Sequence, residues 1–311
     1  MRITHRAVAQ TSLLGLNGNL DRIGKLQQQL TSGRVLNAPS DSPTGTNTAM
    51  QVRQSTAAIT QQARNISDGK SWLDTADTAL NTMLDQVRKV RDLTLSGLST
   101  GSVQGNSASA ISTELSSLRQ SLLELANQTI NGRPVFGGAT TGPRAYDVTT
   151  GAFVGVGGTG TVGGVATQLT VPLVRRVSDS EVIRVDITGP EAFGDAADGR
   201  DLFAVVGDIA AHVLTAGTDP APLQADLAAL DAAFTRLLTS AADIGARAAR
   251  METAEEVNAD LQLTLRGQLA DVEEIDLPKT IMDLNMQQVG YQAALGATAK
   301  AIQPTLLDFL R

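Results

Sequence analysis

Two short segments of the sequence match patterns that support chemistry in other proteins. Residues 97–101 read GLSTG, the form of a nucleophile elbow, and His212 follows later in the chain, as in a hydrolase triad. The elbow needs a strand before its serine and a helix after it, but here a helical pattern precedes Ser99 and a Ser/Gly/Asn-rich stretch follows. We therefore interpret the segment as a turn, and a hydrolase built on Ser99 is the least favoured of three alternative functions.

A second segment, residues 155–160 (GVGGTG), fits the fingerprint of a dinucleotide-binding loop. That loop works only where a strand passes directly into a helix, because the helix N-terminus receives the pyrophosphate. No helical pattern follows here, and the next acidic residue is Asp179. A glycine-rich turn in a β region is the better interpretation.

The acidic clusters have structural interpretations too. Residues 273–276 (EEID) come just before Pro278, where negative charge would cap and stabilise the start of a new helix. Asp195, Asp198 and Asp201 resemble a calcium loop only loosely, because their spacing and the terminal glutamate are wrong, so we predict a turn and a helix N-cap. With only two histidines in the chain, we expect no catalytic residue, cofactor or metal site, and we predict that the protein is not an enzyme.

Composition excludes further classes of protein. The 311 residues are enough for about two domains, and the absence of cysteine excludes disulfides and thiolate metal sites. A net charge of -7 and an aromatic fraction of 3% argue against nucleic acid as a partner. We expect no cleavable signal peptide at the N-terminus and no segment that spans a membrane.

Most of the sequence has helical periodicity. One apolar series recurs every seven residues and predicts a long helix wound against a partner, with packing that strengthens from residue 55 toward residue 85. Its members are Val52, Ile59, Ile66, Leu73, Leu80 and Val87. Residues 95–106 read as a helical hairpin connection, residues 111–125 as a helix that stops at Asn131-Gly132, and residues 223–272 as an element of about 80 Å.

The amino-acid composition and the hydrophobic pattern change between residues 134 and 190. Glycine, threonine and valine dominate there, and residues 168–174 and 181–187 have the β-branched pattern of strands. We predict a small β-rich domain inserted into a helical rod. The fold class is thus mainly α with an inserted β domain, in which both chain ends build a long antiparallel helical rod or coiled-coil bundle.

Each chain end carries a narrow apolar line that is too thin to fold alone. We predict that the two lines pair with each other and with other copies, as an assembly seam. The seam residues are Leu13, Leu16, Leu20, Ile23 and Leu30 near the N-terminus, and Ile281, Leu284, Tyr291, Leu295 and Ile302 near the C-terminus.

Between these ends and the rod the sequence predicts a joint. Gly33 permits a helix to end, Pro39 keeps the preceding residue extended, and Ser42-Pro43 supplies an N-cap and a first-turn proline for the next helix. Pro278 marks the same break where the chain returns.

The order of several motifs resembles the flagellin superfamily. Residues 26–43 (LQQQLTSGRVLNAPSDSP) resemble the family's QQQLSTGKRINSPSDDP, and residues 272–277 (VEEIDL) resemble its VEDVDL. Further similar segments are residues 1–4 (MRIT), 86–93 (QVRKVRDL), 135–138 (VFGG), 244–247 (IGAR) and 306–310 (LLDFL). Flagellins typically carry AKDDAAG where this chain has APSDSP, so the resemblance favours the branch that joins hook to filament over flagellin, the filament subunit, which remains the alternative.

The resemblance implies a structural adaptor of the bacterial flagellum, located outside the cell at the junction of hook and filament and exported by the flagellar type III apparatus without a cleavable signal peptide. Its implied partners are copies of itself in a ring, the hook-side junction protein, flagellin, and an export chaperone at the C-terminal helix. The β domain would face outward. We predict a terminal coiled-coil domain (residues 1–40 and 278–311), a rod domain (41–133 and 200–277) and the inserted β-rich domain (134–199).

Overall fold

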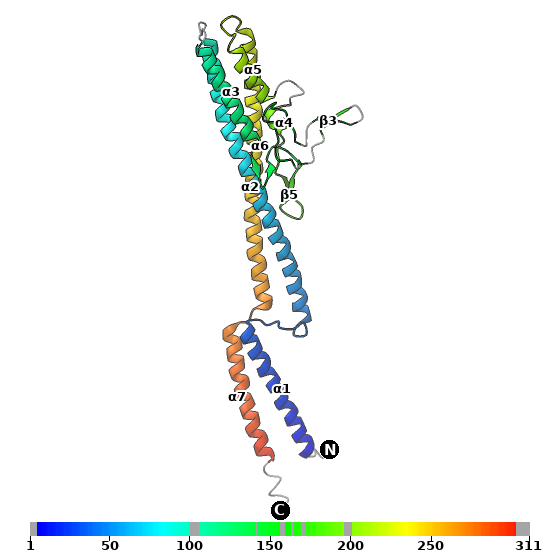
Figure 1. The fold of residues 1–311 in the computed structure, drawn as a ribbon. Coiled ribbons are helices and arrows are strands. Elements are labelled where there is room, and N and C mark those ends of the chain that lie inside the picture. Colours follow the sequence, from blue (N-terminus) through cyan, green and yellow to red (C-terminus); the bar gives the residue numbers. More distant parts are fainter. Residues whose placement is uncertain are drawn as a thin grey trace, which may run out of the picture. The chain divides into compact units, whose positions relative to one another are not determined.

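The computed structural model describes residues 5–99, 106–140, 142–155, 159–162, 165–168, 172–195 and 201–302 (Figure 1). The chain divides into two compact units. Unit 1 consists of Met1–Ile59 and Asp260–Arg311, and unit 2 of Thr60–Ala259.

Helices account for most of the described residues. They are α1 (His5–Ser32), α2 (Pro43–Ser99), α3 (Asn106–Ala126), α4 (Gly189–Phe193), α5 (Leu202–His212), α6 (Ala221–Glu273) and α7 (Leu277–Ile302). The strands are β1 (Thr129–Ile130), β2 (Arg133–Pro134), β3 (Thr159–Val162), β4 (Val165–Gln168), β5 (Val174–Arg176) and β6 (Val182–Arg184), paired as antiparallel hairpins β1-β2, β3-β4 and β5-β6. Within the part of the chain that the structure describes, no helix is long and apolar enough to cross a membrane.

The heptad series lies in α2 as predicted, and its members from Ile66 to Val87 form one wall of the core of unit 2. Leu73 and Leu80 are fully buried, and Val87 is 1% exposed. They belong to a continuous apolar cluster to which α3 contributes Leu115 and α6 contributes Leu237. A helix with one apolar line is stable when neighbouring helices cover that line, and α3, α5 and α6 supply such neighbours here.

Aromatic side chains fill the core next to the β region. Phe136, Tyr146, Phe153, Phe193 and Phe203 contact one another edge to face, with centroids 4.9 to 5.8 Å apart. This geometry places the positive edge of one ring on the negative face of the next. Burial raises the pKa of the Tyr146 hydroxyl far above its ordinary value, so this tyrosine stays neutral in the folded chain.

The predicted mainly α fold with a small β region is confirmed, but its local boundaries need three corrections. The helix α2 continues to Ser99, so residues 95–99 of the predicted hairpin connection are helical. The helix α3 ends at Ala126, not at Asn131-Gly132, because these two residues form the turn between β1 and β2, with φ of 50° and 77°. Asn-Gly is the preferred pair for a two-residue hairpin turn that needs positive φ, and this use of the dipeptide was missed. The predicted strand at residues 168–174 is also displaced: β4 ends at Gln168, residues 169–171 lie outside the described residues, and β5 begins at Val174.

The two segments that match catalytic or cofactor-binding motifs do not have the secondary structure that these motifs require. Residues 97–99 belong to the last turn of α2, where no strand precedes the serine, and residues 100 and 101 lie outside the described part of the chain. His212 Nδ1 lies 2.6 Å from Asp226 Oδ2, but Asp226 follows the histidine in sequence, which is not the hydrolase order. The glycine-rich segment passes into strand β3, not into a helix.

Asp201 is the N-cap of α5, in agreement with the sequence. Its carboxylate accepts the backbone N–H of Ala204 at 2.7 Å. Burial is the largest influence on this carboxyl and raises its pKa, although the hydrogen bonds from the helix N-terminus act in the opposite direction.

Candidate assembly surface and joint

The first connection in unit 1 begins where α1 ends. Gly33 has φ +70° and donates its N–H to the carbonyl of Gln29 at 2.8 Å, which is the usual left-handed cap of a helix C-terminus. Ser32 Oγ then accepts the N–H of Arg34 at 3.2 Å, and Asn37 Nδ2 donates to the Arg34 carbonyl at 3.1 Å. The chain therefore leaves the helix in one fixed direction.

The carboxylate of Asp41 stabilises the second half of this connection. Asp41 Oδ2 accepts the backbone N–H groups of Ala38 at 2.9 Å and Asn37 at 3.2 Å, and Lys25 Nζ lies 3.6 Å from its other oxygen. The hydrogen bond from Ala38 is the main cause that lowers the pKa of Asp41, and Asn37 and Lys25 act in the same direction. An ionised side chain thus holds the turn around Pro39.

The next helix starts as the sequence predicted. Pro43 is the first residue of α2, and Ser42 Oγ accepts the N–H of Gly45 at 3.1 Å. A serine N-cap followed by a first-turn proline needs no N–H from the proline, so the helix begins here without loss of a hydrogen bond.

The returning connection has the same construction. The helix α6 ends at Glu273 and α7 begins at Leu277, with Pro278 in its first turn. Asp276 caps α7, because its carboxylate accepts the N–H of Lys279 at 3.1 Å and its carbonyl accepts the N–H of Thr280 at 2.8 Å. The predicted capping role of the acidic cluster therefore falls on Asp276.

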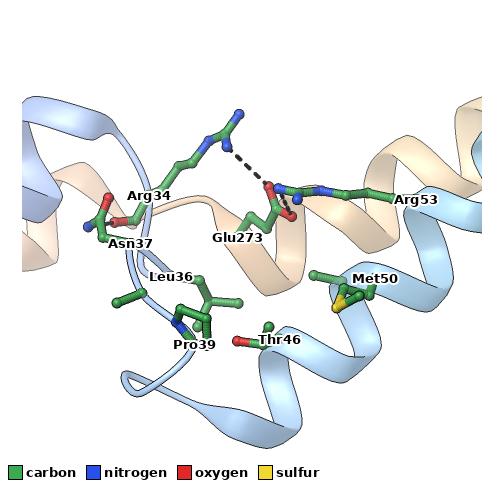
Figure 2. Close-up of a pocket in the computed structure, with 10 residues that line it drawn as sticks. Arg34, Leu36, Asn37, Pro39, Thr46, Met50, Arg53 and Glu273 are labelled. Carbon is green, nitrogen blue, oxygen red and sulfur yellow. Dashed lines mark hydrogen bonds and ion pairs between the residues drawn. The ribbon is translucent and has the colours of Figure 1, made fainter.

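Glu273 has a different role, which sequence reasoning missed. Its side chain is 7% exposed, with Arg53 Nη2 2.7 Å from one carboxylate oxygen and Arg34 Nη1 3.8 Å from the other. Figure 2 shows the carboxylate between the two guanidinium groups. The backbones also pair: Val35 N–H donates to the Glu273 carbonyl at 2.7 Å, and Ile275 N–H to the Gly33 carbonyl at 3.2 Å. The two connections thus form one bonded joint, which a local pattern could not reveal because its members are far apart in sequence.

Beside the joint lies a hollow of about 260 Å³ (Figure 2). The side chains of Leu36, Pro39 and Met50 give it an apolar part, and the two arginines lie at its other side.

The helices α1 and α7 pack side by side in antiparallel directions (Figure 1). Asn19 Oδ1 accepts a hydrogen bond from Gln287 Nε2 at 3.0 Å in the middle of the contact. The less exposed positions recur every three or four residues, which is the pattern of a coiled-coil seam. They include Ser12, Leu16, Asn19, Ile23, Leu26 and Leu30 of α1, and Thr280, Leu284, Gln287, Tyr291, Ala294 and Thr298 of α7.

The predicted seam residues fall into two groups. Leu16 is buried and Ile23, Leu30, Leu284 and Tyr291 are partly buried, so these five lie in the contact between α1 and α7. Four others are exposed, namely Leu13 (59%), Leu20 (46%), Ile281 (42%) and Leu295 (43%), and the side chain of Ile302 lies outside the described residues. The assembly role of all ten stays a prediction.

On α1 and α7, four large apolar side chains are more exposed than any predicted seam residue whose side chain the structure describes. Leu14 is 71% exposed, Met282 65%, Met286 70% and Val289 66%. The sequence analysis missed them because it followed one line per helix, although the spacing of the three α7 residues, four and then three, was visible.

The described residues contain no group of three or more His, Cys, Asp or Glu side chains placed to hold a metal.

Comparison with known proteins agrees with this architecture. Residues 3–141 match the model of the bacterial flagellin N-terminal helical region. Flagellar hook-associated protein 3 is 23% identical in Salmonella typhimurium LT2 (94% of this chain, 95% of that protein) and 24% identical in Escherichia coli K12 (96% of each). Flagellin of Bacillus subtilis 168 is 24% identical along the whole of both chains.

A solved structure shares the fold. The crystal structure of flagellar hook-associated protein 3 from Legionella pneumophila superposes with a TM-score of 0.58 and 14% identity, covering 72% of this chain and 98% of that one. The resemblance to the flagellin superfamily predicted from the sequence is therefore confirmed: residues 3–141 match the model of the bacterial flagellin N-terminal helical region, and the chain is similar to flagellar hook-associated protein 3 along nearly its whole length.

Proposed function

We propose that this chain is a structural component of the bacterial flagellum, an adaptor that joins the hook to the flagellin filament. The observation that carries the proposal is the pair α1 and α7, built from the two ends of the chain, which leaves large apolar side chains exposed. Such a pair gains stability when further helices cover it. The near full-length similarity to flagellar hook-associated protein 3 supports the flagellar setting.

The partners and location follow from this role. The adaptor would contact other copies of itself, the hook-side junction protein and flagellin, and an export chaperone would hold α7 before secretion. It would act outside the cell, after export without a cleavable signal peptide, and would catalyse no reaction. Of the three domains assigned from the sequence, the terminal one (residues 1–40 and 278–311) would make the contacts between subunits.

Flagellin itself is the second candidate, since a flagellin is similar along the whole chain. The APSDSP sequence of the joint favours the adaptor, because flagellins typically carry AKDDAAG there. Seeded polymerisation separates the two: flagellin should extend filament seeds, whereas the adaptor should stay monomeric and bind hook ends.

Labelling the protein in flagellated cells tests the proposal. The label should lie at one position between hook and filament, and a label along the whole filament would favour flagellin. Leu20→Asp and Leu284→Asp should each block incorporation while unit 2 stays folded, whereas Gln28→Asp, a change at an exposed polar position of α1, should not. Normal filament growth with both leucine variants would count against an assembly role for the seam.

The enzyme alternative has its own test. A purified chain with esterase activity that Ser99→Ala abolishes would revive it.

A further inference from the structure

The sequence contains the dipeptide Asn-Gly twice, and the structure places the two copies in different backbone surroundings. Asn17-Gly18 lies in the interior of α1, whereas Asn131-Gly132 forms the exposed turn between β1 and β2. In Asn-Gly the backbone nitrogen of the second residue can attack the asparagine side chain with little hindrance, because glycine has no side chain of its own. The two copies therefore allow one reactive group to be compared in a helix and in a turn.

The reaction at Asn131 is an intramolecular acyl transfer. The backbone nitrogen of Gly132 loses its proton and forms a bond to Cγ of Asn131, the Cγ–Nδ2 bond breaks, and the amide nitrogen takes up a proton and leaves as ammonia. A water molecule then opens the resulting succinimide ring at either of its carbonyl groups, which gives aspartate or isoaspartate. No atom is oxidised or reduced, and water is the only co-reactant.

The hairpin turn leaves the attacking nitrogen accessible. In a two-residue turn the hydrogen bonds join the flanking residues, here Ile130 and Arg133, so the N–H of Gly132 has no partner within the turn. Asn131 and Gly132 are both exposed, and a Cβ added at Gly132 would meet nothing within 4 Å among the described residues. The backbone can therefore rotate toward the geometry of ring closure without displacing a neighbour.

In α1 the same attack is blocked as long as the helix holds. The N–H of Gly18 donates to the carbonyl four residues earlier, as each interior N–H of an α-helix does. Ring closure would have to break this hydrogen bond and turn the backbone of Asn17 out of the helical region. The side chain of Asn17 is exposed, so its protection comes from the backbone and not from burial.

We propose that Asn131 is a site of spontaneous modification, at which the turn between β1 and β2 is converted to isoaspartate or aspartate as the protein ages. The inference does not depend on the proposed function, because Asn131 lies in unit 2 and the reaction requires only water. Isoaspartate adds one carbon atom to the main chain. A two-residue turn with φ of 50° and 77° then no longer joins the strands in the same register.

The altered turn lies next to the core of unit 2. Val135 and Phe136 follow β2 directly and are fully buried, and the carbonyl of Phe136 accepts the N–H of Gly189 at 2.8 Å. A longer main chain in the turn shifts the strand that positions these two side chains, so isoaspartate at position 131 should lower the stability of unit 2. Aspartate should not, since Asp-Gly also suits this type of turn.

Ageing of the purified full chain tests the proposal. After incubation at mildly alkaline pH, peptide mapping by mass spectrometry should find isoaspartate and aspartate at position 131, and the thermal unfolding temperature should fall as isoaspartate accumulates. Asn131→Gly keeps a residue that accepts positive φ but has no side-chain amide, so its unfolding temperature should stay constant over the same incubation. An unmodified Asn131, under conditions that convert Asn-Gly in the urea-unfolded chain, would overturn the proposal.

The other Asn-Gly tests the structural reason. In purified flagella, where α1 is expected to be helical, Asn17 should convert at least about tenfold more slowly than Asn131, because its reaction must wait for the helix to open. In the urea-unfolded chain both should convert at similar rates. Equal rates in flagella would overturn the selection of Asn131 by its turn. Absence of the protein from flagella would overturn the proposed function alone, because ageing of the purified chain still decides this inference.

Discussion

Unit 1 and unit 2 are both built from long helices, yet they differ in whether their large apolar side chains are buried or exposed. In unit 2 the α2 residues Leu73, Leu80 and Val90 are fully buried, and aromatic rings extend the core into the β region. In unit 1 the contact between α1 and α7 includes polar residues such as Asn19 and Gln287, while Met282 and Met286 are exposed. Helical periodicity is common to both, so the two units differ in how fully their apolar side chains are buried.

Hydrogen exchange on the isolated subunit should show the largest contrast. Residues 1–40 and 278–311 should fray and exchange near the rate of an open chain, whereas amides of α2 around Leu80 should be protected by about a thousandfold or more, because they open only with the core. Mass spectrometry of exchange at short times measures this. Strong protection in both terminal segments of the monomer would contradict the expected difference in stability between the two units.

A truncation in each unit sharpens the comparison further. Leu73→Ala should lower the free energy of unfolding by about 2 to 5 kcal/mol, because it leaves a cavity in a closed core. Leu14→Ala, at a side chain that is 71% exposed, should change it by less than about 0.5 kcal/mol. Urea denaturation followed by circular dichroism gives both values, and similar losses would contradict the distinction.

A substitution in the joint should have an effect on stability between those of Leu73→Ala and Leu14→Ala. Arg53→Ala should destabilise it by about 1 to 3 kcal/mol, because the buried carboxylate of Glu273 loses its nearer cation while Arg34 remains at 3.8 Å. The readout is faster hydrogen exchange at residues 41–43 and 273–277, which lie outside the two terminal segments expected to fray. Arg64→Ala is the matched control, since Arg64 donates to Gln61 on its own helix; equal effects of the two variants would exclude a specific role for Glu273.

Acid should give the smallest effect, confined to the turn around Pro39. The folded-state pKa of Asp41 lies below its ordinary value of 3.8, so its stabilisation is present above that value and is lost as the pH falls through the lowered folded pKa. The amide signals of Ala38 should therefore shift in an NMR titration at acid pH. Asp41→Asn should abolish the shift, and a titration unchanged by this variant would contradict the assignment.

The sequence predicted those features that depend on neighbouring residues. The heptads of α2, the Ser42-Pro43 start and the cap before α7 all follow from local pattern and capping chemistry. The ion pairs of Glu273 join segments more than 200 residues apart, and no local pattern encodes them.

The seam was only half predicted, for a geometric reason. A series with spacings of three and four can be drawn along more than one face of the same helix when small and polar residues occupy the true contact. Leu284 and Tyr291 belong to both the predicted and the observed lines, but Thr280, Gln287 and Ala294 gave no apolar signal. The joint was more informative, because Gly33 and the two prolines of APSDSP constrain the backbone directly.

The paired backbones of the joint also have a mechanical consequence. The hydrogen bonds from Val35 to Glu273 and from Ile275 to Gly33 flank the bridge between Arg34 and Glu274. Neither connection can rotate about its own bonds unless the other rotates with it or both hydrogen bonds break. A torque applied to either connection is therefore shared between the two as long as these hydrogen bonds hold.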